Sequence, residues 1–157
     1  CQQPDYCMKE FQSKFSVKAS LKQVQAFHRS TAALKQLSPP PMWVQLHQSE
    51  PLAEGSISRF TLWFLFIPLH WTAKHSEVSE TGFTDQQISG PMKFWQHRHH
   101  FTQQTPHSIR IQDHVKYQLP DGWRGWLLAV LFNPLGLRVL FWYRAMATRF
   151  FIRQMKA

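Results

Sequence analysis

Glycine is scarce in this sequence, and its few copies are not clustered. Only six occur among 157 residues, so the chain lacks the glycine-rich loops whose backbone amides cradle phosphate groups. The Gly-x-Ser-x-Gly turn that presents a nucleophilic serine is missing too. These absences argue against a nucleotide-binding loop and against a serine hydrolase.

Cysteine is rarer still, with Cys1 and Cys7 as the only copies. A disulfide between them would close a loop too small to hold the fold together. Neither lies where a structured segment is expected, so thiol chemistry has little support. Nothing else in the sequence indicates secretion, and we therefore expect a cytoplasmic location. We expect residues 1–7 to be a disordered extension before a natural start at Met8, and residues 8–157 to form one domain.

Long uncharged runs and acidic residues are also in short supply. The two longest uncharged runs, 60–73 and 125–137, each contain a proline and fall short of the roughly 20 residues that a membrane-spanning helix needs. Nine acidic residues face eighteen Lys and Arg, which gives a net charge of +9. The basic residues are scattered, so they indicate solvated surfaces, and no nucleic-acid partner is expected.

Aromatic residues, in contrast, are abundant: the chain has thirteen Phe and seven Trp, and 43% of it is hydrophobic. This composition predicts a packed core rather than a disordered segment. Apolar and polar residues alternate over 11–17, which indicates a half-buried strand. Apolar residues then recur every three or four positions over 20–27, which indicates a helix. A second short helix is expected over 31–37, where the prolines from Pro39 end it.

From residue 42 to 119 the pattern is typical of strands joined by turns, with one corner expected at Ile67-Pro68. The clearest strand is 109–119, where the odd positions are apolar except for Asp113 and the even positions are polar. Helical spacing then returns, is interrupted at Asn133-Pro134, and continues in a long helix. The layout predicts an α+β fold with the helices on one face of an antiparallel sheet.

The segment Gly90–Phe101 resembles the G-P-x-x-x-W-x-H-x-H-x-F strand of bacterial START-like proteins, the SRPBCC superfamily. Four other stretches fit the same group, and together they span nearly the whole chain: Pro39–Met42, Phe83–Gln87, Asp113–Pro120 and Tyr143–Arg149. The resemblance implies a helix-grip fold, in which a curved antiparallel sheet of about seven strands wraps around a long C-terminal helix, with two short helices after the first strand. It also implies a cavity between sheet and helix, in proteins usually described as ligand-binding or polyketide cyclase/dehydrase-like.

Side-chain parity places polar residues on the inner face of this sheet. His97 and His99 share that face with Asp113 of the next strand, and the hairpin around residue 81 brings His75 near Asp85. A buried carboxylate needs partners, and imidazoles are suitable ones. Three interpretations remain open: a polar network that stitches the sheet, the polar end of a ligand cavity, or general acid/base catalysis with these two histidines and Asp113 as candidates.

The candidate ligand-binding residues combine this polar group with an apolar lining: His75, Asp85, Gln87, Trp71, Trp95, His97, His99, Phe101, Asp113, Val115, Tyr117 and Phe141. The cavity itself is predicted to be lined by residues such as Trp71, Trp95, Phe101, Val115, Phe141 and Met146. His97-x-His99 puts two imidazoles on one strand face but assures no third ligand, so neither a metal nor a cofactor is expected.

Three functions follow from these features. The first is binding or carrying a small hydrophobic ligand, such as a lipid, an isoprenoid or a polyketide. The second is a cyclase or dehydratase that uses the His/Asp group. The third is an interaction module with a filled cavity, whose basic, aromatic C-terminal helix contacts a membrane or a protein. The aromatic clusters around Trp123, Trp126 and Trp142 are expected to close the pocket or complete the core rather than to dock.

Overall fold

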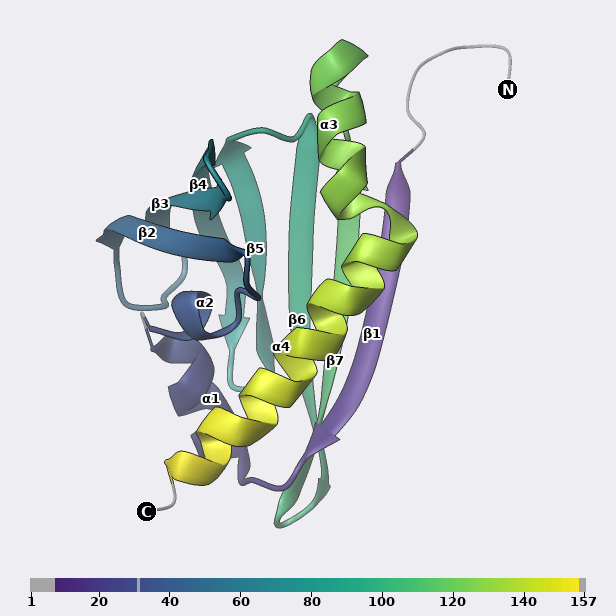
Figure 1. The fold of residues 1–157 in the computed structure, drawn as a ribbon. Helices are drawn as coiled ribbons and strands as arrows, with labels where there is room; N and C mark the ends of the chain where they lie inside the picture. The colour runs from purple at the N-terminus through teal and green to yellow at the C-terminus, as the bar shows by residue number, and fades with distance from the viewer. Residues whose placement is uncertain (1–7, 31, 156–157) are drawn as a thin grey trace.

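The computed structural model describes residues 8–30 and 32–155 (Figure 1), so the extension expected at residues 1–7 lies outside the described residues. Within these two ranges, all strands belong to one antiparallel sheet with the order β1-β7-β6-β5-β4-β3-β2. Chain neighbours pair throughout, except that the first strand lies beside the last. The strands are β1 (Lys9–Val17), β2 (Met42–Ser49), β3 (Ile57–Phe64), β4 (Ile67–Ser79), β5 (Gly82–Ser89), β6 (Phe94–Thr105) and β7 (Ser108–Gln118).

The helices lie on one face of the sheet, and the longest of them crosses it diagonally (Figure 1). They are α1 (Leu21–Arg29), α2 (Ala33–Gln36), α3 (Gly122–Phe132) and α4 (Pro134–Gln154). A curved sheet of seven strands, two short helices after the first strand and a long C-terminal helix confirm the predicted α+β helix-grip architecture. The second helix is shorter than predicted, since it spans a single turn.

The ends of the helices follow from local sequence. Ser20 and Gln23 form a capping box that begins α1, because each side chain satisfies a backbone amide of the other. Asn133 separates α3 from α4, and its Oδ1 accepts a hydrogen bond of 2.8 Å from the Gly136 amide. The interruption predicted at Asn133-Pro134 is therefore confirmed. No described helix is by itself long and apolar enough to cross a membrane; α3 and α4 pass that test only as a pair, across a 45° bend.

Strand register places the predicted polar residues opposite one another. In β6 and β7 the Cα partners are His99 and Asp113, and in β4 and β5 they are His75 and Asp85. Asp85 is also the partner of His97 across β5 and β6. The Asp113 side chain is 6% exposed, so the predicted inward parity is correct; a slip of one residue would have turned it to solvent.

The corner between β3 and β4 lies earlier than predicted. The turn is Leu65-Phe66, with Leu65 in the left-handed region at φ 54°, and Ile67-Pro68 already belongs to β4. Proline is tolerated there because β5 pairs with β4 only from Thr72 onward, so that the beginning of β4 has a neighbour on one side alone. Register shifts between Thr72 and Ala73 and between Ser76 and Ser79 then interrupt the pairing of β4 with β5 and favour a bend in the sheet.

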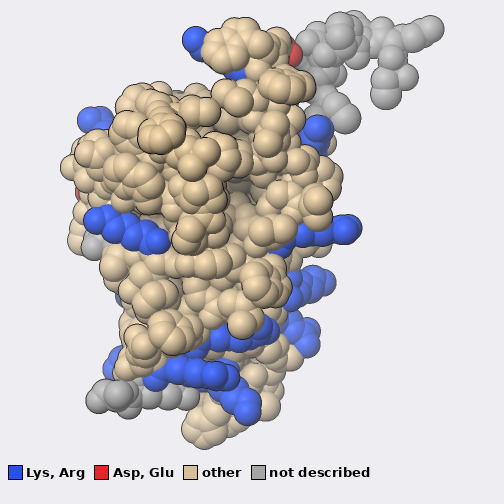
Figure 2. Space-filling model, in the orientation of Figure 1, with Lys and Arg blue, Asp and Glu red and all other residues tan. Residues whose placement is uncertain are grey.

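The outer side of α3 and α4 is unusually apolar. Trp123, Trp126 and Trp142 are 71%, 75% and 65% exposed, so the expectation that these clusters complete the core is wrong for all three. They lie on the helix side opposite to residues that do pack inward, such as Leu137 and Phe141. Most of the face drawn in Figure 2 is neither basic nor acidic; Lys and Arg side chains lie in separate groups, mainly along its right edge and lower part, and almost no acidic side chain is visible.

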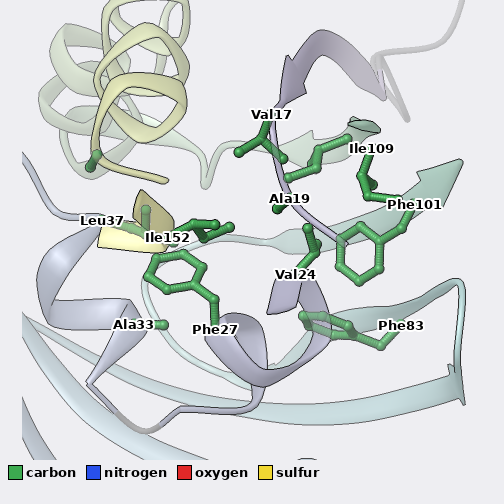
Figure 3. Packing of buried hydrophobic residues seen from close by; sticks show 12 residues of the cluster. Val17, Ala19, Val24, Phe27, Ala33, Leu37, Phe83, Phe101, Ile109 and Ile152 are labelled. Atoms are coloured by element: carbon green, nitrogen blue, oxygen red, sulfur yellow. The ribbon is translucent and has the colours of Figure 1, made fainter. Parts of the chain in front are cut away.

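The core has two parts. One lies under α1, where Val17, Val24, Phe27 and Ile152 meet (Figure 3). The other is built around Trp71, Trp95, Val115, Tyr117, Phe132, Leu137 and Phe141, from the sheet and from both C-terminal helices. Residues that apolar alternation on the strands and the three-to-four spacing along α4 predicted to face inward are therefore buried in this core.

Candidate functional site

A cavity of about 190 Å³ lies between the sheet and the helices. Its wall is mostly apolar and comes from α2, the strands β2 to β6, and the helices α3 and α4. Members of this wall include Leu34, Leu37, Leu46, Phe60, Leu62, Trp71, Ala73, Phe83, Trp95, Phe132 and Leu140. Arg29 and Glu50 are ionisable members of the lining, and six further ionisable side chains from the sheet, α1 and α4 form one group: His28, His75, Asp85, His97, His99 and Arg144. We call this group the polar end of the cavity.

Four contacts join five of the predicted residues into a chain across β4, β5, β6 and β7. His75 Nε2 lies 3.0 Å from Asp85 Oδ1, and His99 Nε2 lies 3.1 Å from Asp85 Oδ2. On the other side, His99 Nδ1 and His97 Nε2 lie 3.0 and 2.8 Å from the same oxygen, Asp113 Oδ1. We call these residues the His–Asp chain. Two carboxylates therefore alternate with three imidazoles.

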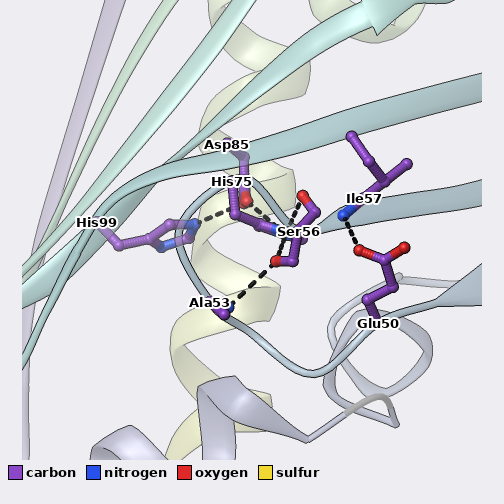
Figure 4. Close-up of polar contacts among 7 residues, drawn as sticks. All are labelled: Glu50, Ala53, Ser56, Ile57, His75, Asp85 and His99. Carbon is purple, nitrogen blue, oxygen red and sulfur yellow. Dashed lines mark hydrogen bonds and ion pairs between the residues drawn. The ribbon is translucent and has the colours of Figure 1, made fainter.

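His75, the first histidine of the His–Asp chain, is also held at its other ring nitrogen, Nδ1, by Ser56. Ser56, which is buried just before β3, contacts His75 Nδ1 through its hydroxyl at 2.9 Å and through its carbonyl oxygen at 3.1 Å (Figure 4). The Ser56 hydroxyl also accepts a hydrogen bond of 3.1 Å from the amide of Ala53. These contacts fix the ring so that Nε2 points at Asp85.

A carboxylate faces each ring nitrogen of His99, and this arrangement favours the protonated form of its imidazole. Burial acts to lower the pKa of His99, but Asp113 and Asp85 outweigh it, and the pKa lies above its ordinary value. Burial would raise the pKa of each carboxyl, yet the histidine contacts hold both well below their usual range. The contact between His99 Nδ1 and Asp113 lacks good hydrogen-bond geometry, and so does the contact between Asp85 Oδ1 and His75. Charge therefore carries those two contacts.

Two further histidines beside His99 are neutral. Burial, and then the charge of His99, lower the pKa of His28 and of His97 to about 4. His97 donates its Nε2 hydrogen to Asp113, and His28 donates its Nδ1 hydrogen to the carbonyl of Val24 at 2.9 Å. The remaining ring nitrogen of each is an acceptor at neutral pH.

These pKa shifts predict a stability maximum near pH 6.5. Between pH 6.5 and 4 the unfolded chain protonates His28 and His97 while the folded protein does not, so stability falls by about 1.4 kcal/mol per pH unit for each group. Above pH 6.5 stability falls as the pH rises, because His75 and His99 have raised pKa values and lose their protons as the pH passes through them.

Urea unfolding at half-unit pH steps measures this dependence of stability on pH. His28→Gln should halve the acid slope, and a flat profile between pH 6.5 and 4.5 would contradict the assignment.

Seven of the predicted binding residues line the cavity: Trp71, His75, Asp85, Gln87, Trp95, His97 and His99. Asp113 lies behind the two histidines. Five other residues that were predicted to line the cavity do not. Phe101, Val115, Tyr117 and Phe141 are buried in the core, and Met146 is about half exposed. The reason is that α4 packs directly on the β1 side of the sheet, with the rings of Phe11 and Phe141 5.1 Å apart. The free space therefore lies on the side covered by the short helix α2.

Sequence reasoning missed two members of the polar end. His28 follows Val24 by one helical turn and adjoins Phe27, so its place on the apolar side of α1 was the available signal. Arg144 follows Phe141 by three residues, its guanidinium lies 5.5 Å from the centroid of that ring, and its side chain reaches the cavity lining. An arginine at such a position departs from the usual pattern of a buried helix face.

Three of the ionisable residues have the spacing of a metal site. One ligand atom from each of Asp85, His97 and His99 lies within 4.8 Å of the others, which adds the third ligand that the sequence did not assure. However, both nitrogens of His99 face carboxylates and its pKa is raised, so a proton competes directly with any metal. The donor set fits a protonated His–Asp chain better than a metal centre.

Comparison with known proteins identifies the fold. No protein-family model matches the chain, and no curated protein matches it either. Among solved structures, the Zhui aromatase/cyclase from Streptomyces sp. R1128 aligns over 96% of both chains with a TM-score of 0.73 at 11% identity. Norcoclaurine synthase from Thalictrum flavum aligns over 99% of this chain and 100% of its own (TM-score 0.66, 15% identity). A START superfamily protein from Mycobacterium smegmatis aligns over 93% and 98% (TM-score 0.69, 12% identity). The chain therefore has the START/SRPBCC-like helix-grip fold.

Proposed function

We propose that the protein binds or carries a small hydrophobic ligand, of the lipid, isoprenoid or polyketide kind, in the cavity between the sheet and the helices. The observation that carries this proposal is the division of the cavity into a broad apolar wall and one ionisable end. Sites for small molecules have this composition, because the apolar wall supplies affinity and a few polar groups fix the orientation. The fold supports it as well, since the solved structures that share it include an aromatase/cyclase.

The apolar wall suits a flat or extended ligand body. Trp71 stands edge-on to Trp95, with ring centroids 5.5 Å apart, and is stacked against Phe60 at 6.0 Å. Such rings hold one another in place, so the wall keeps its shape without a ligand. Phe132 closes against Trp95 from the end of α3, at 5.6 Å. A ligand would therefore enter a largely preformed space and lose little affinity to rearrangement of the protein.

This proposal predicts that the neutral fluorescent probe N-phenyl-1-naphthylamine binds the cavity, with increased emission and with about micromolar affinity, typical of a small apolar site. Leu62→Trp should weaken probe binding at least about tenfold, because the larger ring fills space that Leu62 now borders. Leu135→Trp makes the same substitution at an exposed position of α4 and should change nothing. A wild-type protein that leaves the probe dark, or equal binding by the Leu62 variant, would contradict the proposal.

A second candidate is a cyclase or dehydratase-type enzyme that uses the same cavity. The observation that favours it is the close placement of histidines whose pKa values shift in opposite directions: the rings of His28 and His97, with pKa values lowered to about 4, lie 5.8 and 3.9 Å from the ring of His99, whose pKa is raised. A neutral imidazole can accept a proton and an imidazolium can donate one, which is what acid/base chemistry on a bound carbonyl compound requires. Conversion of a bound ligand, not binding alone, separates this candidate from a carrier.

We also propose that α3 and α4 contact an anionic membrane surface. Their outer side exposes large apolar residues along both helices: Trp123, Trp126, Val130, Leu135, Val139, Trp142, Met146 and Phe150. We call this set the outer aromatic face. No acidic residue follows Asp121, whereas α3 and α4 carry four arginines besides Arg144 of the cavity lining. Apolar groups flanked only by positive charge suit a negatively charged lipid surface better than a neutral protein groove.

A further inference from the structure

Arg144 reaches the polar end of the cavity without a partner for its charge. No carboxylate oxygen of residues 8–30 or 32–155 lies within 4.0 Å of its guanidinium, and no hydrogen bond from the guanidinium is found within those ranges. Its guanidinium carbon lies 5.5 Å from the centroid of the Phe141 ring. Arg144 therefore brings a guanidinium, with five N–H donors, to the cavity lining without an acceptor from the described residues.

The surrounding charges do not replace such an acceptor. Burial lowers the pKa of Arg144, and the charges of Asp113 and Asp85 act against that lowering from a distance. Both carboxylates are already occupied by the histidines of the His–Asp chain, with His99 between them. The remaining ring nitrogens of His28 and His97 are acceptors, but within the described residues neither forms a hydrogen bond with Arg144. Arg144 is partly exposed and has no charged partner among the described residues, so a bound anion can pair with it without breaking a contact within the protein.

We propose that the ligand is an amphipathic acid whose carboxylate pairs with Arg144 while its apolar body lies along the wall formed by Phe60, Trp71 and Trp95. The inference rests on the proposed binding function and adds the chemical class of the head group. A guanidinium matches a carboxylate through two parallel N–H···O bonds, and this geometry favours an oxyanion over a hydroxyl or an amide. His99 lies between Asp85 and Asp113, and its protonated form, which these carboxylates favour, would offset their repulsion of a bound anion.

Displacement of N-phenyl-1-naphthylamine by octanoic acid and by 1-octanol at pH 7.5 tests the inference, because the two compounds share an apolar chain and differ in the head group. The wild-type protein should release the probe at an octanoate concentration about 10- to 100-fold below that of octanol, as expected for a charge-assisted hydrogen bond in a desolvated site. Arg144→Gln should abolish this preference, so that acid and alcohol act at similar concentrations. Arg144→Lys, which keeps the charge without the planar fork, should retain part of it.

Arg153→Gln is the matched control, because it removes the same charge from an exposed position on the same helix. It should keep the full preference for octanoate; a preference lost equally in both variants would show that net charge, not Arg144, attracts the acid. Equal displacement by acid and alcohol in the wild type would overturn the inference while leaving the binding site in place. Failure of the probe itself to bind would instead overturn the proposed function. Thermal melting of each variant confirms that the comparison is made on folded protein.

Discussion

Asp113→Leu is expected to destabilise the protein by about 3–5 kcal/mol, the range found when one partner of a buried charged pair is removed. The Asp113 side chain is 6% exposed, and a single oxygen contacts both His97 and His99. The leucine would leave the Nε2 hydrogen of His97 without an acceptor and would remove one of the two counter-charges of His99. Asp113→Asn should be milder, because it keeps an acceptor while it loses the charge. Urea unfolding at pH 7 measures both.

Glu10→Leu provides a matched control on the outer face of the same sheet. Glu10 contacts His114 at 3.0 Å across β1 and β7, but the carboxylate is half exposed, so this change should move stability by less than about 1 kcal/mol. Since Asp113 does not line the cavity, Asp113→Asn should lower the melting temperature more than it changes probe binding. Loss of probe binding with unchanged melting would instead place Asp113 at the ligand.

The predicted strand register was correct because two neighbouring strands each show a clear alternation of inward and outward residues. Alternation along 109–119 turned Asp113 inward, and the same alternation along 95–101 turned His97 and His99 inward, so their contact follows from the pairing of neighbouring strands alone. The hairpin between β4 and β5 brought His75 to Asp85 for the same reason. Short-range periodicity in the sequence thus predicts most of the contacts of the His–Asp chain.

The place of the cavity could not be predicted in this way, because it depends on how the helices pack. Parity shows that Val115 and Phe141 face inward, but not that α4 lies directly against them and leaves no space. The free volume arises where α2 is too short to cover the sheet, and its length was overestimated. Arg144 was missed for a related reason: a helix pattern describes one apolar side and does not show which cation on its margin turns into a cavity.

The exposed tryptophans show the opposite failure, in which residues expected to be buried are not. Apolar spacing in α3 and α4 favours burial on both sides, because Leu128 and Phe132 alternate with Trp126 and Val130 along the same helix. Only one side can meet the sheet, so the other remains uncovered. An apolar face of this extent on a helix is unfavourable in water and indicates an interaction surface.

The protein is therefore expected to bind vesicles of phosphatidylcholine with 30% phosphatidylserine, and to bind pure phosphatidylcholine at least about tenfold more weakly, since each basic residue near an anionic surface contributes about 1 kcal/mol. The double variant Trp126→Gln/Trp142→Gln should reduce binding to the anionic vesicles by about 100-fold or more, because two large rings lose their burial in the interface region. Cosedimentation with vesicles measures both effects, and 0.5 M salt should weaken the wild type strongly.

Trp43→Gln is the control for these substitutions, because Trp43 is also half exposed but lies on β2, where it stacks on Trp63 with ring centroids 5.3 Å apart. It should bind vesicles as the wild type does. If the outer aromatic face instead joins two copies of the chain, sedimentation velocity will show a dimer that the double tryptophan variant dissociates, and vesicle binding will be absent. Vesicle binding that survives the double variant would contradict the proposal in a different way, because it would place the contact on the scattered basic residues alone and leave the aromatic rings without a role.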